Sequence, residues 1–95
     1  MKLAFDPQRK VPVGIVYATA TVARQLDRID VLKALDRHQD GDWGLVSESD
    51  ATENEFVLIN GLRLLSVFED RKGVRFWIIT EADRSYTTVL FPSDY

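Results

Sequence analysis

The sequence predicts an α+β fold in which three short helices pack on one face of an antiparallel sheet, in the order β-α-α-α-β-β-β. Three runs rich in Val, Ile, Leu, Phe, Trp and Thr follow one another at 62–70, 74–81 and 86–91. Short polar turns at 71–73 and 83–85 separate them. Such runs and turns are typical of a meander, here a C-terminal three-stranded one. Helical spacing upstream indicates the layer that covers this sheet.

The length of 95 residues predicts a single domain with one core, spanning residues 1–95. Hydrophobic residues make up 45% of the chain and charged residues 28%, which is usual for a globular protein and argues against intrinsic disorder. Residues 1–10 contain Pro7 and little periodicity, so we expect them to fray or to lie along the surface.

Charge and composition exclude several classes of function. Twelve Lys and Arg against fifteen Asp and Glu give a net charge of −3, and no dense basic run is present, so we expect no direct nucleic-acid binding. The absence of cysteine excludes disulfides and thiolate chemistry. No apolar run approaches the ~20 residues of a membrane span, and Pro7 interrupts the N-terminal stretch where a signal peptide needs its apolar core. We therefore expect a cytoplasmic protein without membrane contact.

The N-terminal third predicts a strand followed by a short helix. A strand is expected within 11–18, and Pro12, which cannot donate to a ladder, favours an edge position. Thr19 or Thr21 can then cap a helix over 22–26. The side chains with the spacing of a buried stripe are Val22, Leu26 and Ile29.

Two longer helices follow. Asp30 is expected to cap a helix over 31–39, and Ser47 is expected to cap another over 48–60, which Gly61 ends. The side chains expected to face inward are Val31, Leu32 and Leu35 in the first of these helices, and Ala51, Leu58, Ile59 and Phe56 in the second.

The lone histidine, His38, lies just before Asp40 and Asp42. An imidazole with two carboxylates can bind zinc, and a histidine can also serve as a general base. Yet no second histidine completes a familiar metal-ligand spacing, and a histidine at a helix C-terminus interacts favourably with exposed carbonyls. We therefore expect neither a metal ion nor a cofactor.

Trp43 lies between Gly41 and Gly44 in a predicted loop. A tryptophan in this setting usually folds back into the core, with its indole N–H on an acceptor. We favour that burial, against the third helix or the sheet, over an exposed anchor for a protein partner.

The turn between the last two strands contains Glu81, Asp83, Arg84 and Ser85. Asp83 is expected to accept a backbone N–H within the turn, and Arg84 to pair with a nearby carboxylate. Ser85, His38 and a carboxylate could in principle form a hydrolase triad, but no nucleophile elbow surrounds this serine.

Two segments carry a resemblance, 38–44 with its Gly-Asp-Trp-Gly sequence and 76–90. With Asn54, they are similar to the recurring motifs of a family of small bacterial proteins encoded on plasmids and integrated elements. The resemblance extends over 11–95. Leu45 departs from this pattern at a position that is frequently acidic or polar, which weighs against an acidic site in the loop. The resemblance implies a mobile-genetic-element setting and brings no catalytic residues.

These observations favour a non-catalytic protein-interaction module of a mobile genetic element, such as an inhibitor of a host restriction or CRISPR complex. Clustered acidic residues suit a partner with a basic nucleic-acid groove. The expected partner-binding residues are Asp40, Asp42, Trp43, Glu48, Asp50, Glu81, Asp83 and Arg84. The alternative is a small nuclease, hydrolase or toxin–antitoxin component that uses His38 with nearby carboxylates.

The central strand of the meander predicts a second candidate surface. Phe76 and Ile78 point to one of its faces, and Trp77 and Ile79 point to the other. Helices in so short a chain cover one face, so the other exposes large apolar side chains of this strand, alongside apolar side chains from 62–70 and 86–91. We expect that face to bind a partner or a second copy of the chain, unless residues 1–10 fold over it.

Overall fold

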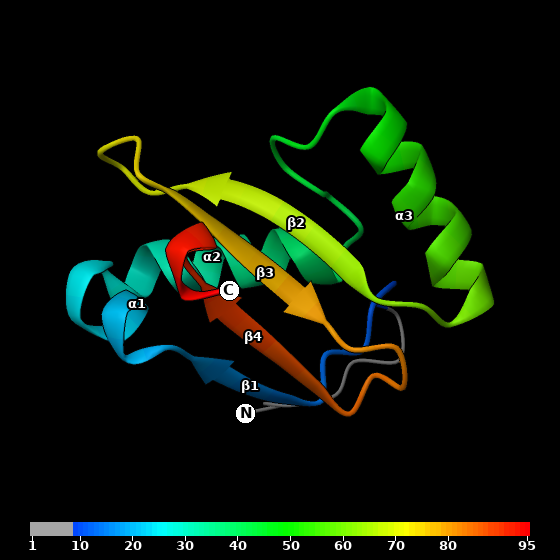
Figure 1. Ribbon diagram of the computed structural model, residues 1–95, viewed down its shortest axis with the longest axis horizontal. Helices are drawn as coiled ribbons and strands as arrows, with labels where there is room; N and C mark the ends of the chain where they lie inside the picture. Colours follow the sequence, from blue (N-terminus) through cyan, green and yellow to red (C-terminus); the bar gives the residue numbers. More distant parts are fainter. Residues whose placement is uncertain (1–8) are drawn as a thin grey trace.

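The computed structural model describes residues 9–95 (Figure 1). The elements follow the expected order β-α-α-α-β-β-β, and a 3-10 turn that the sequence does not indicate comes after the last strand. Their bounds are β1 Ile15–Ala18, α1 Ala20–Gln25, α2 Arg28–Gln39, α3 Glu48–Asn60, β2 Leu64–Glu69, β3 Arg75–Thr80, β4 Tyr86–Leu90 and the 3-10 turn Pro92–Asp94. Residues 1–10 are expected to fray or to lie along the surface, and residues 1–8 of this segment fall outside the described part of the chain.

The four strands form one mixed sheet in the order β1-β4-β3-β2. The meander of β2, β3 and β4 is antiparallel, as expected. β1 lies at an edge, also as expected, but Ile15 pairs with Tyr86 in a parallel ladder, so the expectation of a purely antiparallel sheet is wrong. The physical reason is visible in Figure 1, where α2 runs back behind the sheet and β2 therefore starts in the direction of β1. The chain reverses at the turn after β2 and again at the turn after β3, so β4 runs in the same direction as β1.

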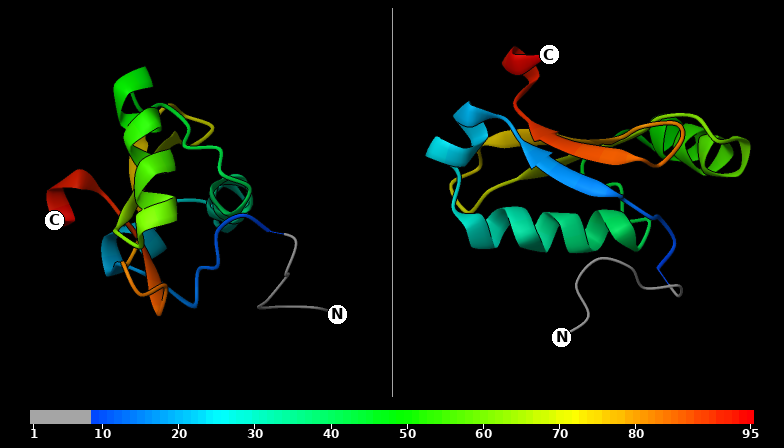
Figure 2. Two further views of the ribbon diagram at one scale, coloured as in Figure 1. Left: turned by 90° about the vertical axis from the view of Figure 1, so that its right-hand side faces the viewer. Right: turned by 90° about the horizontal axis from the view of Figure 1, so that it is seen from below.

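Among the helices of residues 9–95, only α2 lies along a face of the sheet, so the expectation that all three helices pack on one face is also wrong. Figures 1 and 2 show α1 at the end of β1 and α3 beside β2, at the opposite side of the molecule. α1 has only six residues, and the loop before α3 carries that helix past the edge of β2. The layer under the sheet is therefore a single helix with α1 at its end.

The core consists of two clusters of buried side chains. The larger lies between the sheet, α1 and α2, and its members are Val22, Leu26, Ala34, Leu35, Phe68, Phe76, Ile78, Val89 and Phe91. The smaller lies between α3, β2 and the loops near them, and its members are Val11, Val13, Trp43, Val57 and Leu64. The second cluster explains how α3 is held, although it covers no face of the sheet.

Side-chain oxygens cap the three helices. The Thr19 hydroxyl accepts from the N–H of Val22 (3.3 Å), and the Ser47 hydroxyl accepts from the N–H of Asp50 (3.0 Å), as the sequence predicts. The cap of α2 is Asp27 rather than Asp30, because the helix starts one turn earlier than expected.

The inward faces of the helices differ from the expected ones at three positions. Ile29, Leu32 and Phe56 are 56%, 54% and 57% exposed. The residues that face inward instead include Ala34, His38, Asn54 and Val57. Two of these are polar, and a search for apolar stripes passes over polar residues. The side chain of Ile59, also expected on the packed side, lies outside what the structure describes.

The outer edge of β2 is closed by the loop before α3 and by α3 itself. The N–H of Val67 donates to the carbonyl of Trp43 (3.1 Å), and the N–H of Leu45 donates to the carbonyl of Val67 (2.7 Å). The Asn54 amide donates to the carbonyl of Leu65 (2.7 Å). Gly44 lies against this edge with φ of 72°, and a Cβ there would overlap the carbonyl oxygen of Val67. The edge is therefore protected from pairing with another chain.

Among residues 9–95, no helix has both the length and the apolar character that crossing a membrane requires.

Candidate functional site

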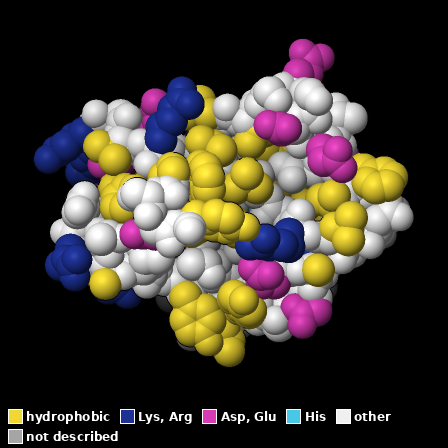
Figure 3. Space-filling view, in the orientation of Figure 1, with side chains coloured by type: hydrophobic (Ala, Val, Ile, Leu, Met, Phe, Trp, Pro, Cys, Tyr) yellow, Lys and Arg dark blue, Asp and Glu magenta, His cyan; other side chains and the backbone are white. Residues whose placement is uncertain are grey.

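The side of the sheet that faces away from α2 carries a band of apolar and aromatic side chains. Phe76 and Ile78 point toward α2 and are fully buried, so alternation along the strand places Trp77 and Ile79 on the other side. We call this side the open face. Its residues are Ile15, Tyr17, Leu65, Val67, Trp77, Ile79, Tyr86, Thr88 and Leu90. Figure 3 shows hydrophobic side chains across the middle of this side of the molecule.

Tyr95 lies over one part of the open face. Its ring packs edge-on against Trp77 with 5.9 Å between centroids, and it remains 71% exposed. Arg63 donates to the Tyr95 hydroxyl (3.0 Å), and its guanidinium carbon lies 5.7 Å from the centre of the ring. These residues, with Leu65 and Ile79, line a shallow apolar depression. The open face thus offers a hollow as well as a flat band.

Ion pairs lie at both ends of this band. Arg63 contacts Glu81 over 3.4 Å, and Arg75 contacts Glu69 over 3.5 Å. The hydrogen bond to Tyr95, followed by the charge of Glu81, raises the pKa of Arg63. Each cation on this surface therefore has a carboxylate beside it, and the surface has no excess of positive charge that would attract a phosphate backbone.

His38 lies beneath the sheet and is fully buried. Its Nδ1 is 2.6 Å from the Ser66 hydroxyl, and its Nε2 is 2.8 Å from the Thr80 hydroxyl. The Trp43 ring packs edge-on against the imidazole at 5.8 Å. Both ring nitrogens are satisfied by hydroxyl groups of the sheet, so His38 does not combine with Asp40 and Asp42 into a metal-ligand set.

The direction of this hydrogen-bond chain follows from its last acceptor. The Thr87 hydroxyl donates to the carbonyl of Val13 (2.8 Å), and a carbonyl can only accept. The Thr80 hydroxyl, 2.7 Å from that of Thr87, must then donate to it. His38 must in turn donate from Nε2 to Thr80, so Nε2 carries a proton. On the other side of the ring, the Ser66 hydroxyl can donate to Nδ1 of a neutral imidazole.

Electrostatics agrees with a neutral imidazole. Burial, with a smaller contribution from the positive charge of Arg84, lowers the pKa of His38 to about 4. A histidine in this state joins α2 to the sheet, and its ring nitrogens are not available to a substrate.

Three of the expected partner-binding residues lie in the loop before α3. Asp40 contacts Arg9 over 2.7 Å, and Asp42 contacts Arg37 over 2.7 Å. The hydrogen bond from Arg37 lowers the pKa of Asp42. The burial expected for Trp43 is confirmed, because its side chain is 5% exposed. Its indole N–H donates to a carboxylate oxygen of α3 over 2.9 Å.

Two others, Glu48 and Asp50, lie in the first turn of α3 and are exposed. Among residues 9–95, neither forms an ion pair, and the same holds for Glu53 one turn later. Figure 3 shows acidic side chains over α3 and Lys and Arg side chains at the opposite end of the molecule. α3 therefore presents a negatively charged surface in this view.

The last three residues of the set lie at the turn between β3 and β4. Glu81 pairs with Arg63, as described above. Asp83 accepts from the N–H (3.0 Å) and the hydroxyl (2.6 Å) of Ser85, which confirms its expected role in the turn. These bonds lower the pKa of Asp83. They also leave Ser85 hydrogen-bonded to Asp83, while His38 is bonded to other hydroxyls.

Among residues 9–95 Arg84 pairs with no carboxylate, so the expected ion pair is not found there. Its guanidinium donates to the carbonyls of Leu62 (2.6 Å), Glu81 (2.9 Å) and Val57 (3.4 Å). Val57 lies in the last turn of α3, and its carbonyl also accepts from the N–H groups of Gly61 and Leu62. Arg84 also has a φ of 62°, in the left-handed region. It therefore ties the end of α3 to the last turn of the meander.

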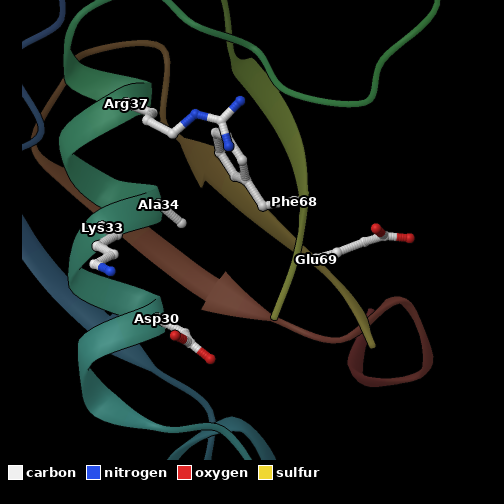
Figure 4. Close-up of a pocket in the computed structure, with 6 residues that line it drawn as sticks. All are labelled: Asp30, Lys33, Ala34, Arg37, Phe68 and Glu69. Carbon is white, nitrogen blue, oxygen red and sulfur yellow. The ribbon is translucent and has the colours of Figure 1, made fainter. Parts of the chain in front are cut away.

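A further depression lies between α2 and β2 (Figure 4), lined by Asp30, Lys33, Ala34, Arg37, Phe68 and Glu69. The guanidinium of Arg37 lies over the Phe68 ring, 4.8 Å from its centre. Asp30 accepts two hydrogen bonds from the guanidinium of Arg71, at 2.9 and 3.0 Å. The Arg37 guanidinium and the Asp30 carboxylate are therefore already engaged within the chain.

The eight expected residues thus fall in three places, and among residues 9–95 no hydrogen bond or ion pair joins one place to another. Within the same residues, no group of three or more His, Asp or Glu side chains is arranged to hold a metal ion. The expectation that apolar side chains from 62–70 lie on the exposed face is met by Leu65 and Val67. Sequence reasoning missed Arg63 and Tyr95, and no signal identified Tyr95.

Comparisons of the chain with protein-family models, with curated proteins and with solved structures find no match.

Proposed function

We propose that this protein is a non-catalytic protein-interaction module that binds its partner through the open face of the sheet. The observation that carries the proposal is the apolar band centred on Trp77, which no helix of residues 9–95 covers. Large apolar bands on the surface of a small protein are typical of protein-binding sites. Aromatic residues such as Trp77 and Tyr95, with Arg63 beside them, are the types most frequent at the centres of interfaces.

The charge of this surface favours a protein over a nucleic acid. Its two ion pairs balance, whereas a nucleic-acid site needs cations that neutralise phosphates. Tyr17 and Tyr86 extend the band toward β1 and are 53% and 40% exposed. A protein surface with apolar or aromatic side chains is therefore the complementary partner.

We infer that the partner is a component of a host nucleic-acid-processing defence complex, encountered in the cytoplasm by a protein of a mobile genetic element. Two observations support this narrower proposal. The resemblance of 38–44 and 76–90 to plasmid-encoded proteins suggests the setting. Glu48, Asp50 and Glu53 give α3 a negative surface that suits a basic nucleic-acid groove.

The enzyme alternative receives less support from the structure. His38, its proposed base, is fully buried, and both of its ring nitrogens are bonded to hydroxyls. Asp40 and Asp42 contact arginines of their own chain. A general base must reach the proton that it removes, and this imidazole faces the sheet.

The test is a phage-plating assay in bacterial strains that each carry one defined restriction or CRISPR complex. Expression of the protein should raise plating efficiency at least about tenfold in one strain and should leave the defence-free strain unchanged. Val67→Lys places a charge on the open face and should abolish the effect. Val74→Lys, at a 43% exposed site in the turn between β2 and β3, is the matched control and should retain it.

Binding of the purified protein to the purified complex, followed by calorimetry, completes the test. Equal protection by the wild type and by Val67→Lys would show that the open face is not the surface used. Absence of both protection and binding in every strain tested would refute a defence complex as the partner.

A further inference from the structure

The outer edge of β1 is unpaired, unlike that of β2. Ile15 donates its N–H to Ser85 (3.1 Å), and Thr19 donates its N–H to β4 (3.0 Å). Because backbone groups alternate in direction along a strand, Val16 and Ala18 turn their N–H and C=O groups away from β4. Among residues 9–95, no hydrogen bond reaches those outward groups, and no strand lies beyond β1.

The side chains of β1 do not protect this edge. The strand reads Ile-Val-Tyr-Ala and contains no charged residue. Ile15, Val16 and Tyr17 are 62%, 40% and 53% exposed. Edge strands that remain single usually carry a lysine, a proline or a bulge that prevents pairing. β1 has none of these within its four residues, so it is suited to accept another strand.

A groove lined by both apolar and polar residues runs beneath this edge, on the side of α2. Val16 lines it from the strand, and Leu32 and Leu35 line it from the helix. Leu32 is 54% exposed although it lies in the middle of α2. A strand added to β1 would therefore need an apolar layer beneath it to fill this groove.

The same side of α2 carries a self-complementary charge pattern. Arg28, Leu32 and Asp36 follow one another at intervals of four residues, so they form one stripe on the helix. Arg28 forms no ion pair among residues 9–95, whereas Asp36 contacts Arg9 over 3.0 Å and keeps its carboxylate 68% exposed. In an antiparallel second copy of this helix, Arg28 would meet the Asp36 of that copy, and Leu32 would meet its own counterpart.

We propose that two copies of the chain form a symmetric dimer through β1, with the two strands antiparallel and the two-fold axis at Tyr17. Val16 then exchanges two backbone hydrogen bonds with Ala18 of the second copy, and symmetry doubles these to four. The two sheets become one sheet of eight strands. Such an axis stands perpendicular to the sheet, so both α2 helices lie on the same face and contact each other along the stripe. This dimer forms through the backbone edge of β1, whereas the proposed partner surface is centred on Trp77. Tyr17 lies at the rim of that surface, so the Val67→Lys variant is used below to separate the two.

Cysteine cross-linking tests the position of the axis, because the chain contains no cysteine of its own. Tyr17→Cys places two thiols at a directly opposed pair, where Cα atoms about 4.5–5.5 Å apart allow a disulfide. Thr88→Cys is the matched control: Thr88 pairs with Tyr17 on β4 and shares its face, but lies one strand farther from the axis. Under air oxidation, Tyr17→Cys should become a covalent dimer and Thr88→Cys should stay unlinked.

A charge exchange tests the contact between the helices. Arg28→Asp should weaken the dimer at least about tenfold in sedimentation equilibrium, and the double variant Arg28→Asp with Asp36→Arg should recover most of that loss. Lys72→Asp makes the same change of charge in the turn between β2 and β3 and should have no effect. Circular dichroism of each variant verifies that the fold is kept.

A wild-type protein that stays monomeric at roughly 1 mM would overturn the proposal. A dimer in which neither cysteine variant cross-links, or in which the double variant gives no recovery, would also overturn it, because such a dimer would use another surface. Loss of the dimer on Val67→Lys would assign self-association to the open face instead.

Discussion

Nε2 of His38 lies 2.8 Å from the hydroxyl of Thr80, and this contact joins the only helix beneath the sheet to the central strand. Thr80 continues to Thr87 and then to the carbonyl of Val13, so one hydrogen-bond chain connects α2, β3, β4 and the segment before β1. The Thr80 hydroxyl donates its proton to Thr87, and the Thr87 hydroxyl donates its proton to the carbonyl of Val13. Such a chain stabilises the fold only when all of its members are present.

Replacement of His38 by alanine should therefore be strongly destabilising. The variant leaves the buried hydroxyls of Ser66 and Thr80 without their partner and opens a cavity beside Trp43. We expect a loss of about 3 kcal/mol in the free energy of unfolding, measured by urea denaturation. Lys33→Ala, at an exposed site of the same helix, is the control and should change it by less than about 0.5 kcal/mol. An equal effect of the two substitutions would contradict the structural role of the chain.

The stability of the wild type should fall as the pH falls from about 6.5 to about 4. The pKa of His38 is about 4 in the folded state, against about 6.5 when unfolded, so the unfolded chain binds more protons in this window. The buried neutral imidazole stabilises the fold fully at pH values above the pKa of His38 in the unfolded chain. Up to about 3 kcal/mol of this stabilisation is lost when the pH reaches the lower end of the window. Urea denaturation across the window measures this loss.

The same titration of His38→Ala should lack this component. Carboxylates whose pKa values are lowered in the folded state, such as Asp30 and Asp83, contribute mainly below this window. If the free energies of unfolding of the wild type and of His38→Ala changed in parallel between pH 6.5 and 4.5, the imidazole would not be held neutral in the folded state.

Arg84 provides a test that separates backbone strain from hydrogen bonding. Arg84→Ala removes the donors to Leu62, Glu81 and Val57 while keeping a Cβ at positive φ, and should cost about 2 kcal/mol. Arg84→Gly removes the same donors but tolerates this φ, so it should be about 1 kcal/mol less destabilising than the alanine variant. Thermal denaturation of both variants gives the comparison. If glycine were the more damaging substitution, left-handed strain at this turn would be ruled out.

Gly44 and Gly73 form a second matched pair, because both have positive φ values, 72° and 83°. A Cβ at Gly44 would overlap the carbonyl of Val67, whereas a Cβ at Gly73 would have no heavy atom within 4 Å beyond its chain neighbours. Gly73→Ala should therefore cost about 1 kcal/mol, and Gly44→Ala at least about 2 kcal/mol. Hydrogen exchange should also show faster exchange of the Val67 amide in Gly44→Ala alone, since its bond to Trp43 is lost.

The sequence predicts the local elements well because their signals are local. Ser47 and Gly61 delimit α3 through a side-chain cap and a left-handed residue, and both act within one turn of the helix. The direction of β1 is different, because it depends on where a chain of three helices returns to the sheet. No residue near Ile15 encodes its parallel pairing with Tyr86.

The candidate site was predicted only in part, for a similar reason. Alternation along β3 separates Trp77 from Phe76, but it cannot say which of the two α2 covers. Tyr95 reaches the open face through the 3-10 turn after β4, and a lone aromatic residue after a proline gives no periodic signal. His38 was considered for chemistry because of its neighbours in sequence, whereas its neighbours in space are hydroxyls from two strands.

The parallel pairing of β1 with β4 also has a consequence for biosynthesis. Within residues 9–95, β1 pairs with β4, which follows β2 and β3 along the chain, so β1 leaves the ribosome well before its partner and cannot pair until residues 86–90 have emerged. Until then its apolar side chains have no sheet to join, and the segment is a natural target for a chaperone. A stalled nascent chain that stops before Tyr86 should therefore contain helices, whereas the amides of β1 should not be protected from hydrogen exchange. They should gain protection only once β4 has emerged from the ribosome.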